Sequence, residues 1–101
     1  MKQIYFKQSK LTDQVCSSKE PTYFVFQGEN TKKTPLSIQS HKVSCACTTV
    51  SYPDKIPMGS FEVILKIDKT GQRGNFIQSC HLTFSNGQTE IIYVTGRINE
   101  E

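Results

Sequence analysis

The chain has 101 residues, a hydrophobic content of 36% and a formal net charge of +3. This length predicts a single domain, residues 1–101, that can bury a hydrophobic core. No apolar stretch approaches the ~20 residues of a transmembrane helix, and the lysines and arginines are too scattered for the basic stripe of a nucleic-acid-binding surface. We therefore expect no membrane insertion and no nucleic-acid partner.

The N-terminal region has the alternation of apolar and polar residues that is typical of strands. Residues 2–7 predict a first strand with Ile4 and Phe6 on one face. A weaker alternation over residues 11–16 predicts an edge-like continuation, and a turn follows. We interpret residues 1–20 as an N-terminal edge strand and arm, placed before the rest of the domain.

The rest of the chain repeats this period of two between turn-forming residues. The predicted strands are 22–27, 35–39, 61–67, 76–84 and 91–98. Residues 28–34 predict a polar hairpin loop, residues 52–60 an irregular crossover with two prolines, and Asn86-Gly87 a type I′ hairpin turn. Short strands at this spacing predict an all-β fold, an immunoglobulin-like antiparallel β-sandwich of about seven strands.

Two of the four cysteines, Cys45 and Cys47, form the densest cluster of reactive side chains. Zinc knuckles separate paired cysteines by two to four residues instead of one, and the strand alternation directs Cys80 and His81 to opposite faces. A nucleophilic cysteine needs a base within reach, and the spacing of His41 from Cys45 suits a helix. We expect no catalytic residue, no metal and no cofactor, and interpret the pair as buried side chains where the chain passes between sheets.

The expected redox state of the cysteines follows from the expected cellular compartment of the chain. The N-terminus has no apolar leader segment, so the chain is expected to be unexported and its cysteines to be reduced thiols, with a disulfide as the open alternative. A small zinc or thiol-redox protein that uses Cys45 and Cys47 remains an alternative function of another class.

Several short motifs occur in one order between residues 21 and 98. They are Phe24-Val25-Phe26, Asn30, Pro35-Leu36-Ser37-Ile38, Ser44-Cys45-Ala46-Cys47-Thr48, Gly59, Gly74-Asn75-Phe76, Asn86 and Gly96. In this order they resemble a bacterial family of immunoglobulin-like domains of unknown function, similar to Hydin-type domains. The family carries a Ser-Cys-Gly-Cys-Thr signature; here Ser44, Cys45, Cys47 and Thr48 form the structural motif, and Ala46 replaces the glycine. The resemblance implies a fold and a binding role, and it supplies no catalytic residue.

A stand-alone domain of this kind looks like the accessory domains of tailed-bacteriophage capsids. We therefore expect a non-enzymatic structural protein-binding module, most concretely a virion accessory protein that decorates a capsid lattice, found in the virion or in the host cytoplasm before assembly. Its oligomeric state would be set by the assembly. The alternative is a bacterial immunoglobulin-like adaptor of the cytoplasm or of the envelope, including the periplasm. The expected protein-binding residues are Tyr5, Lys7, Lys10, Leu11, Lys32 and Lys33.

Overall fold

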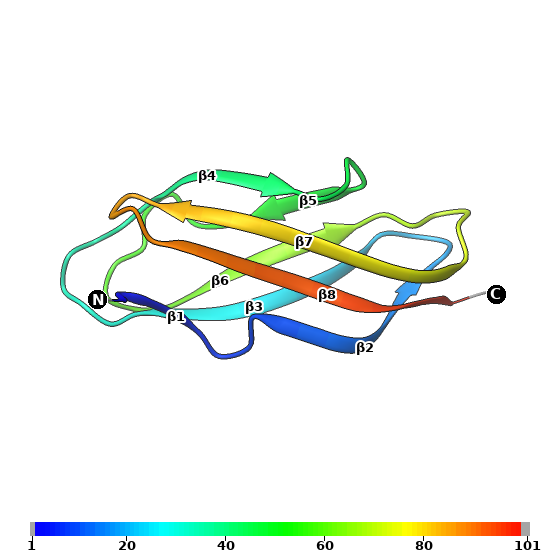
Figure 1. Cartoon of the computed structure of the whole chain (residues 1–101), viewed down its shortest axis with the longest axis horizontal. Coiled ribbons are helices and arrows are strands. Elements are labelled where there is room, and N and C mark those ends of the chain that lie inside the picture. Colours follow the sequence, from blue (N-terminus) through cyan, green and yellow to red (C-terminus); the bar gives the residue numbers. More distant parts are fainter. Residues whose placement is uncertain (1, 100–101) are drawn as a thin grey trace.

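A computed structural model describes residues 2–99. Within these residues, eight strands form two stacked sheets of four, with the orders β1-β3-β6-β5 (sheet I) and β2-β8-β7-β4 (sheet II) (Figure 1). The strands are β1 Ile4–Phe6, β2 Lys10–Ser17, β3 Thr22–Asn30, β4 Ile38–Val43, β5 Thr48–Ser51, β6 Gly59–Ile67, β7 Gly74–Phe84 and β8 Thr89–Asn99. The predicted all-β sandwich is confirmed, with eight strands instead of about seven. Among residues 2–99, no helix is long and apolar enough to cross a bilayer.

One pair of strands departs from the predicted antiparallel arrangement. The chain pairs with β3 as β1 in sheet I, leaves that sheet after Phe6, and enters sheet II as β2. There β2 runs parallel to β8, with Cys16 opposite Ile98. The expectation of a wholly antiparallel sandwich is wrong at this pair, because the alternation of a segment shows that it is a strand but not which strand it pairs with.

The core lies between the two sheets and follows the alternation of each strand. In β6 every second residue from Phe61 to Ile67 is buried, and β7 buries Phe76, Leu82 and Phe84 in the same way. The N-terminal strands contribute Ile4 from β1 and Cys16 from β2, both fully buried. The described part of the predicted arm, residues 2–20, therefore contains two edge strands that belong to the common core.

Two predicted turns have a different form. Gly87 has a φ of 89° while Asn86 keeps a negative φ, so the hairpin between β7 and β8 is not type I′. The Gly87 N–H donates to the Phe84 carbonyl at 2.9 Å, and the Phe84 N–H donates to the Gln88 carbonyl at 2.9 Å, as in a longer loop with a left-handed glycine. Residues 28–34 do not form a hairpin loop, since β3 continues to Asn30 in sheet I and the chain then crosses to β4 in sheet II.

A buried asparagine fixes the end of the sandwich at this crossover. Asn30 has 0% exposure. Its Oδ1 accepts hydrogen bonds from Gln3 Nε2 at 3.0 Å and from the Lys32 N–H at 3.2 Å, and its Nδ2 donates to the carbonyls of Thr34 at 3.1 Å and Ile56 at 3.0 Å. One side chain thus joins three separate segments of the chain, and all of its hydrogen-bonding capacity is used.

Candidate functional site

The cysteine turn, residues 44–48, carries the chain from β4 of sheet II to β5 of sheet I (Figure 1). A disulfide joins Cys45 and Cys47, whose Cα atoms are 5.1 Å apart. The expectation of reduced thiols is wrong for this pair, because the backbone turns back on itself, with the Thr48 N–H donating to the Cys45 carbonyl at 3.0 Å. We expected both side chains to be buried between the sheets, but both are only half-buried. The place of the turn, between two sheets, is as predicted.

Hydrogen bonds to β7 hold both ends of the cysteine turn. The Oε1 of Gln78 accepts hydrogen bonds from Ser44 Oγ at 3.0 Å and from Thr48 Oγ1 at 3.3 Å. Ser44 Oγ also accepts the Ser79 N–H at 2.9 Å. The structure therefore brings the four predicted motif residues together and adds Gln78, which is buried. Its signal in the sequence is a polar residue at an inward position of a strand that is otherwise apolar on that face.

The other two cysteines, Cys16 and Cys80, are free and fully buried. Burial raises the pKa of the Cys80 thiol to about 11. Burial also raises the pKa of Cys16, against the opposing effects of a hydrogen bond with Thr22 and the charge of Lys69. Neutral thiols in an apolar core are poor nucleophiles and poor metal ligands, so these two residues act as small apolar side chains.

No cluster of three His, Cys, Asp or Glu side chains that could hold a metal ion is found within residues 2–99. His41, the nearest candidate base in the sequence, directs its Nδ1 to the Tyr52 hydroxyl at 2.8 Å. The two rings meet edge to face, with their centroids 5.6 Å apart. His41 is thus paired with Tyr52 across the two sheets.

Sheet I has an open edge over residues 22–26 of β3. The last bond from the β1 segment joins the Lys7 N–H to the Gln27 carbonyl at 2.9 Å, and beyond it β3 pairs only with β6 among the described residues 2–99. The Gln27 carbonyl points to this open side. The backbone N–H and carbonyl groups of the alternate residues Val25 and Tyr23 therefore point there too. Their side chains are 44% and 61% exposed. A hollow of about 350 Å³ lies beside Val25, lined also by Lys7, Gln8 and Gln27.

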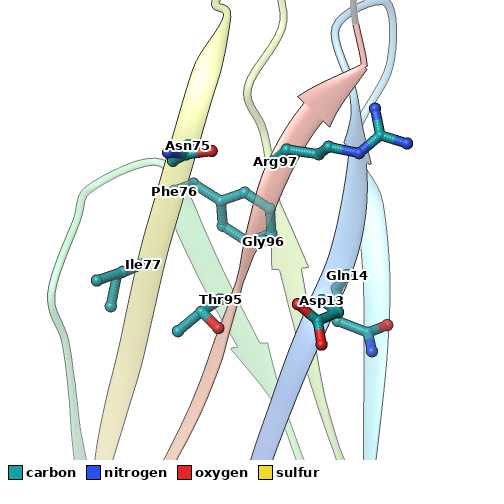
Figure 2. Close-up of a pocket in the computed structure, with 8 residues that line it drawn as sticks. All are labelled: Asp13, Gln14, Asn75, Phe76, Ile77, Thr95, Gly96 and Arg97. Atoms are coloured by element: carbon teal, nitrogen blue, oxygen red, sulfur yellow. The ribbon is translucent and has the colours of Figure 1, made fainter.

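A second hollow, of about 420 Å³, lies on the outer face of sheet II where β2 bulges over β8 (Figure 2). Gly96 leaves room for the bulge, in which Asp13 adopts a φ of 58°. The lining residues are Asp13, Gln14, Asn75, Phe76, Ile77, Thr95, Gly96 and Arg97. Among its lining residues within 2–99, one carboxylate and one guanidinium are the only charged groups, and none carries a thiol or an imidazole.

The predicted protein-binding residues of the N-terminal segment are divided between the two sheets. Tyr5, 46% exposed, and Lys7 lie beside the open edge of sheet I. Lys10 belongs to sheet II, where its Nζ lies 5.5 Å from the centre of the Tyr93 ring. Leu11 is half-buried and packs against the core. These residues therefore do not form one surface.

The predicted loop residues lie elsewhere. Lys32 and Lys33 are exposed in the crossover between β3 and β4. This crossover is at the opposite end of β4 from the cysteine turn (Figure 1). The predictions placed an edge strand in residues 1–20 and did not identify the open edge of β3, because edge pairing depends on which strands become neighbours.

A family described as "Protein of unknown function (DUF1573)" matches residues 4–98 of the chain. The chain belongs to this family. The matched residues include β1 and β2, whose side chains also contribute to the core. A comparison with curated proteins gives no match.

Solved structures show the same architecture at low sequence identity. A protein of unknown function from Porphyromonas gingivalis W83 is 14% identical with a TM-score of 0.75, covering 93% of this chain and 46% of its own. The ASH / PapD-like domain 7 of human CEP192 is 15% identical with a TM-score of 0.70, covering 98% of this chain and 87% of its own. The chain thus spans less than half of the Porphyromonas protein. These likenesses establish an immunoglobulin-like, PapD-like fold.

Proposed function

We propose that this domain is a non-enzymatic protein-binding module that takes up an extended segment of a partner along the open edge of β3. The observation that supports the proposal is the early departure of β1 from sheet I, which leaves residues 22–26 paired on one side only. Strand addition to such an edge is a common mode of peptide recognition. The added segment would continue the line of β1, antiparallel to β3.

The geometry limits what the edge contributes to affinity. Tyr23 and Val25 offer one N–H and one carbonyl each, so about four hydrogen bonds, at about 0.5–1.5 kcal/mol each, would form. Association consumes much of this free energy. Cross-strand contacts of the partner with the exposed side chains of Tyr23 and Val25 must supply the remainder.

Two lysines beside the edge favour an acidic partner segment, while the carboxylate of Glu62 is bound by Gln27 Nε2 at 2.7 Å. Lys7 is exposed at one end of the open edge. At the other end, Lys66 lies across from Tyr23 with its Nζ 6.0 Å from the ring centre. The net charge of +3 acts in the same direction. We infer a short strand-forming segment with apolar residues in its middle and carboxylates near its ends.

Val25→Pro tests this proposal with little change to the fold. Proline removes the outward N–H of Val25, while the bonds between β3 and β6 use the alternate residues Phe24 and Phe26. Val25→Thr is the matched control, because it keeps the branched shape and the N–H. Peptides selected from a displayed library are expected to bind the wild type and Val25→Thr, and to lose binding to Val25→Pro. Equal binding to both variants contradicts the proposed edge.

Hydrogen exchange examines the same edge without a partner. The amides of Tyr23 and Val25 are expected to exchange rapidly, and those of Phe24 and Phe26 slowly, because only the second pair donates to β6. Comparable protection of all four amides would mean that the edge is already occupied.

The proposal has a more specific form, in which the partner is a bacteriophage capsid lattice and the domain decorates the virion. This form is supported by the sequence resemblance alone. The alternative is an adaptor in the bacterial cytoplasm or periplasm, and the disulfide in the cysteine turn favours the oxidising periplasm. Co-sedimentation with assembled capsids separates them, since a monomer that binds no capsid excludes the virion role.

A further inference from the structure

We propose that the cysteine turn is a thiol–disulfide exchange site for a small thiol that carries a carboxylate, with attack at Cys47. The proposal is independent of the open edge, which lies in sheet I on β3. It assigns a chemical activity to a segment that the binding function does not use.

Access and chain geometry both favour exchange at this disulfide. Cys45 and Cys47 are half-buried at the sandwich surface, whereas Cys16 and Cys80 are fully buried. The bond closes a loop with one intervening residue, so it restrains the unfolded chain very little. Such a bond is not needed to hold the domain together.

Other bonds keep the turn in place when the disulfide opens. The Ser44 N–H donates to the Ser79 carbonyl at 3.0 Å, and the Asp68 N–H donates to the Cys47 carbonyl at 3.0 Å. Gln78 holds both Ser44 and Thr48 through their hydroxyls. The two sulfurs are therefore kept close together in both redox states, as a reversible couple requires.

The two sulfurs are not equivalent. Cys45 Sγ accepts the Cys47 backbone N–H at 3.1 Å, and such a bond stabilises a thiolate. Cys47 Sγ lies 3.8 Å from Thr48 Oγ1, whose proton is directed to Gln78. Cys45 is thus the better leaving group, and an incoming thiolate attacks Cys47.

A hollow of about 210 Å³ adjoins the turn on the outer side of β4 and β7. It is lined by Lys42, Val43, Ser44, Ser79 and His81. The ammonium of Lys42 and the hydroxyl of Ser79 can donate to a carboxylate. Ser44 immediately precedes Cys45, so a bound carboxylate would bring a small thiol close to the disulfide. This arrangement is the reason for assigning an acidic thiol of the glutathione class.

The reaction balances with two thiols. The first thiolate attacks Cys47 Sγ, the disulfide breaks, and its electron pair goes to Cys45, which takes a proton. A second thiolate attacks the sulfur of the first thiol in the mixed disulfide, releasing Cys47, which takes the second proton. Two electrons and two protons pass from the two thiols to the protein, and the thiols leave as one disulfide.

Redox titration of the full chain tests the site. The protein is equilibrated in buffers with different ratios of reduced to oxidised glutathione, alkylated, and weighed by intact mass spectrometry. We expect one two-electron transition confined to Cys45 and Cys47, with an unchanged circular dichroism spectrum in both states. A pair that remains oxidised at every ratio until the chain unfolds, or remains reduced at every ratio, overturns the proposal.

Charge variants test the recognition of the thiol. Lys42→Glu is expected to slow reduction by glutathione several-fold and to leave reduction by neutral 2-mercaptoethanol unchanged. Lys33→Glu, with the same charge change at the far end of β4, is expected to alter neither rate. Equal effects of the two variants would refute the carboxylate site, and reduction by a protein dithiol alone would refute the small thiol. After acid quenching, a glutathione adduct on Cys47 supports the assigned direction of attack, and one on Cys45 overturns it.

Discussion

Gly96→Ala is expected to destabilise the domain through the pairing of β2 with β8. An added Cβ at Gly96 would lie 1.9 Å from the carbonyl oxygen of Gln14, 2.6 Å from its carbonyl carbon and 2.8 Å from its nitrogen. All three atoms belong to the backbone, so no side-chain rotation relieves the contact. β2 must retreat by about 1.5 Å to restore an ordinary contact. This movement weakens the parallel ladder that ends at Ser17 and takes the side chain of Cys16 out of the core.

The expected loss in the free energy of unfolding combines the effect of overpacking with that of lost strand pairing. Overpacking contributes about 1–3 kcal/mol, and the weakened ladder brings the expected loss to about 3 kcal/mol, or roughly 12–24 °C in Tm for a domain of this size. Urea unfolding followed by circular dichroism measures it. Gly87→Ala is the control, because Gly87 has a φ of 89° and open space around its Cα, so only backbone strain of about 1 kcal/mol is expected. A Gly96→Ala loss no larger than the control's would refute the argument.

Three further predictions concern buried and bonded groups. Asn30→Asp sets a carboxylate oxygen against the Ile56 carbonyl and should lower the free energy of unfolding by about 3 kcal/mol in urea; a near-neutral effect would contradict the buried network. Since burial raises the pKa of Cys80 from 9.0 to about 11, stability should hold below pH 9. The free energy of unfolding should then fall by up to about 1.4 kcal/mol per pH unit as the pH rises to about 11. The Cys80→Ala variant should show a shallower slope, and equal slopes in the two proteins would contradict this prediction. Replacing both Cys45 and Cys47 with serine should cost less than about 1.5 kcal/mol in thermal unfolding, because the loop they close is very short; a loss of about 3 kcal/mol would instead assign the disulfide a structural role.

The strands and the core could be predicted from the sequence, because they depend on local alternation. Phe61 to Ile67 and Phe76 to Phe84 alternate in the sequence as they do in burial. The pairing of strands is a different matter, since it depends on residues far apart in the chain. β2 carries only a weak alternation, and nothing local distinguishes an antiparallel neighbour from the parallel one it has in β8.

The candidate sites were less predictable for the same reason. The sequence marks Cys45 and Cys47 as a notable pair, but the turn that joins their sulfurs is held by Gln78 and Ser79, more than thirty residues away. The open edge has no sequence signal at all, since Tyr23 and Val25 look like the outward residues of any strand. Their unpaired backbone becomes visible only when β1 is seen to leave the sheet.

The parallel pairing of β2 with β8 also constrains how the domain forms. β2 lies far ahead of β8 in the chain, so β2 has no permanent partner during synthesis until β8 emerges. Closing such a long loop is entropically costly and places this contact late in folding. Sheet I, whose four strands all precede β7, can assemble first. Partly synthesised chains that lack β8 would therefore expose both β2 and the inner face of sheet I, which makes them prone to aggregation until β8 emerges.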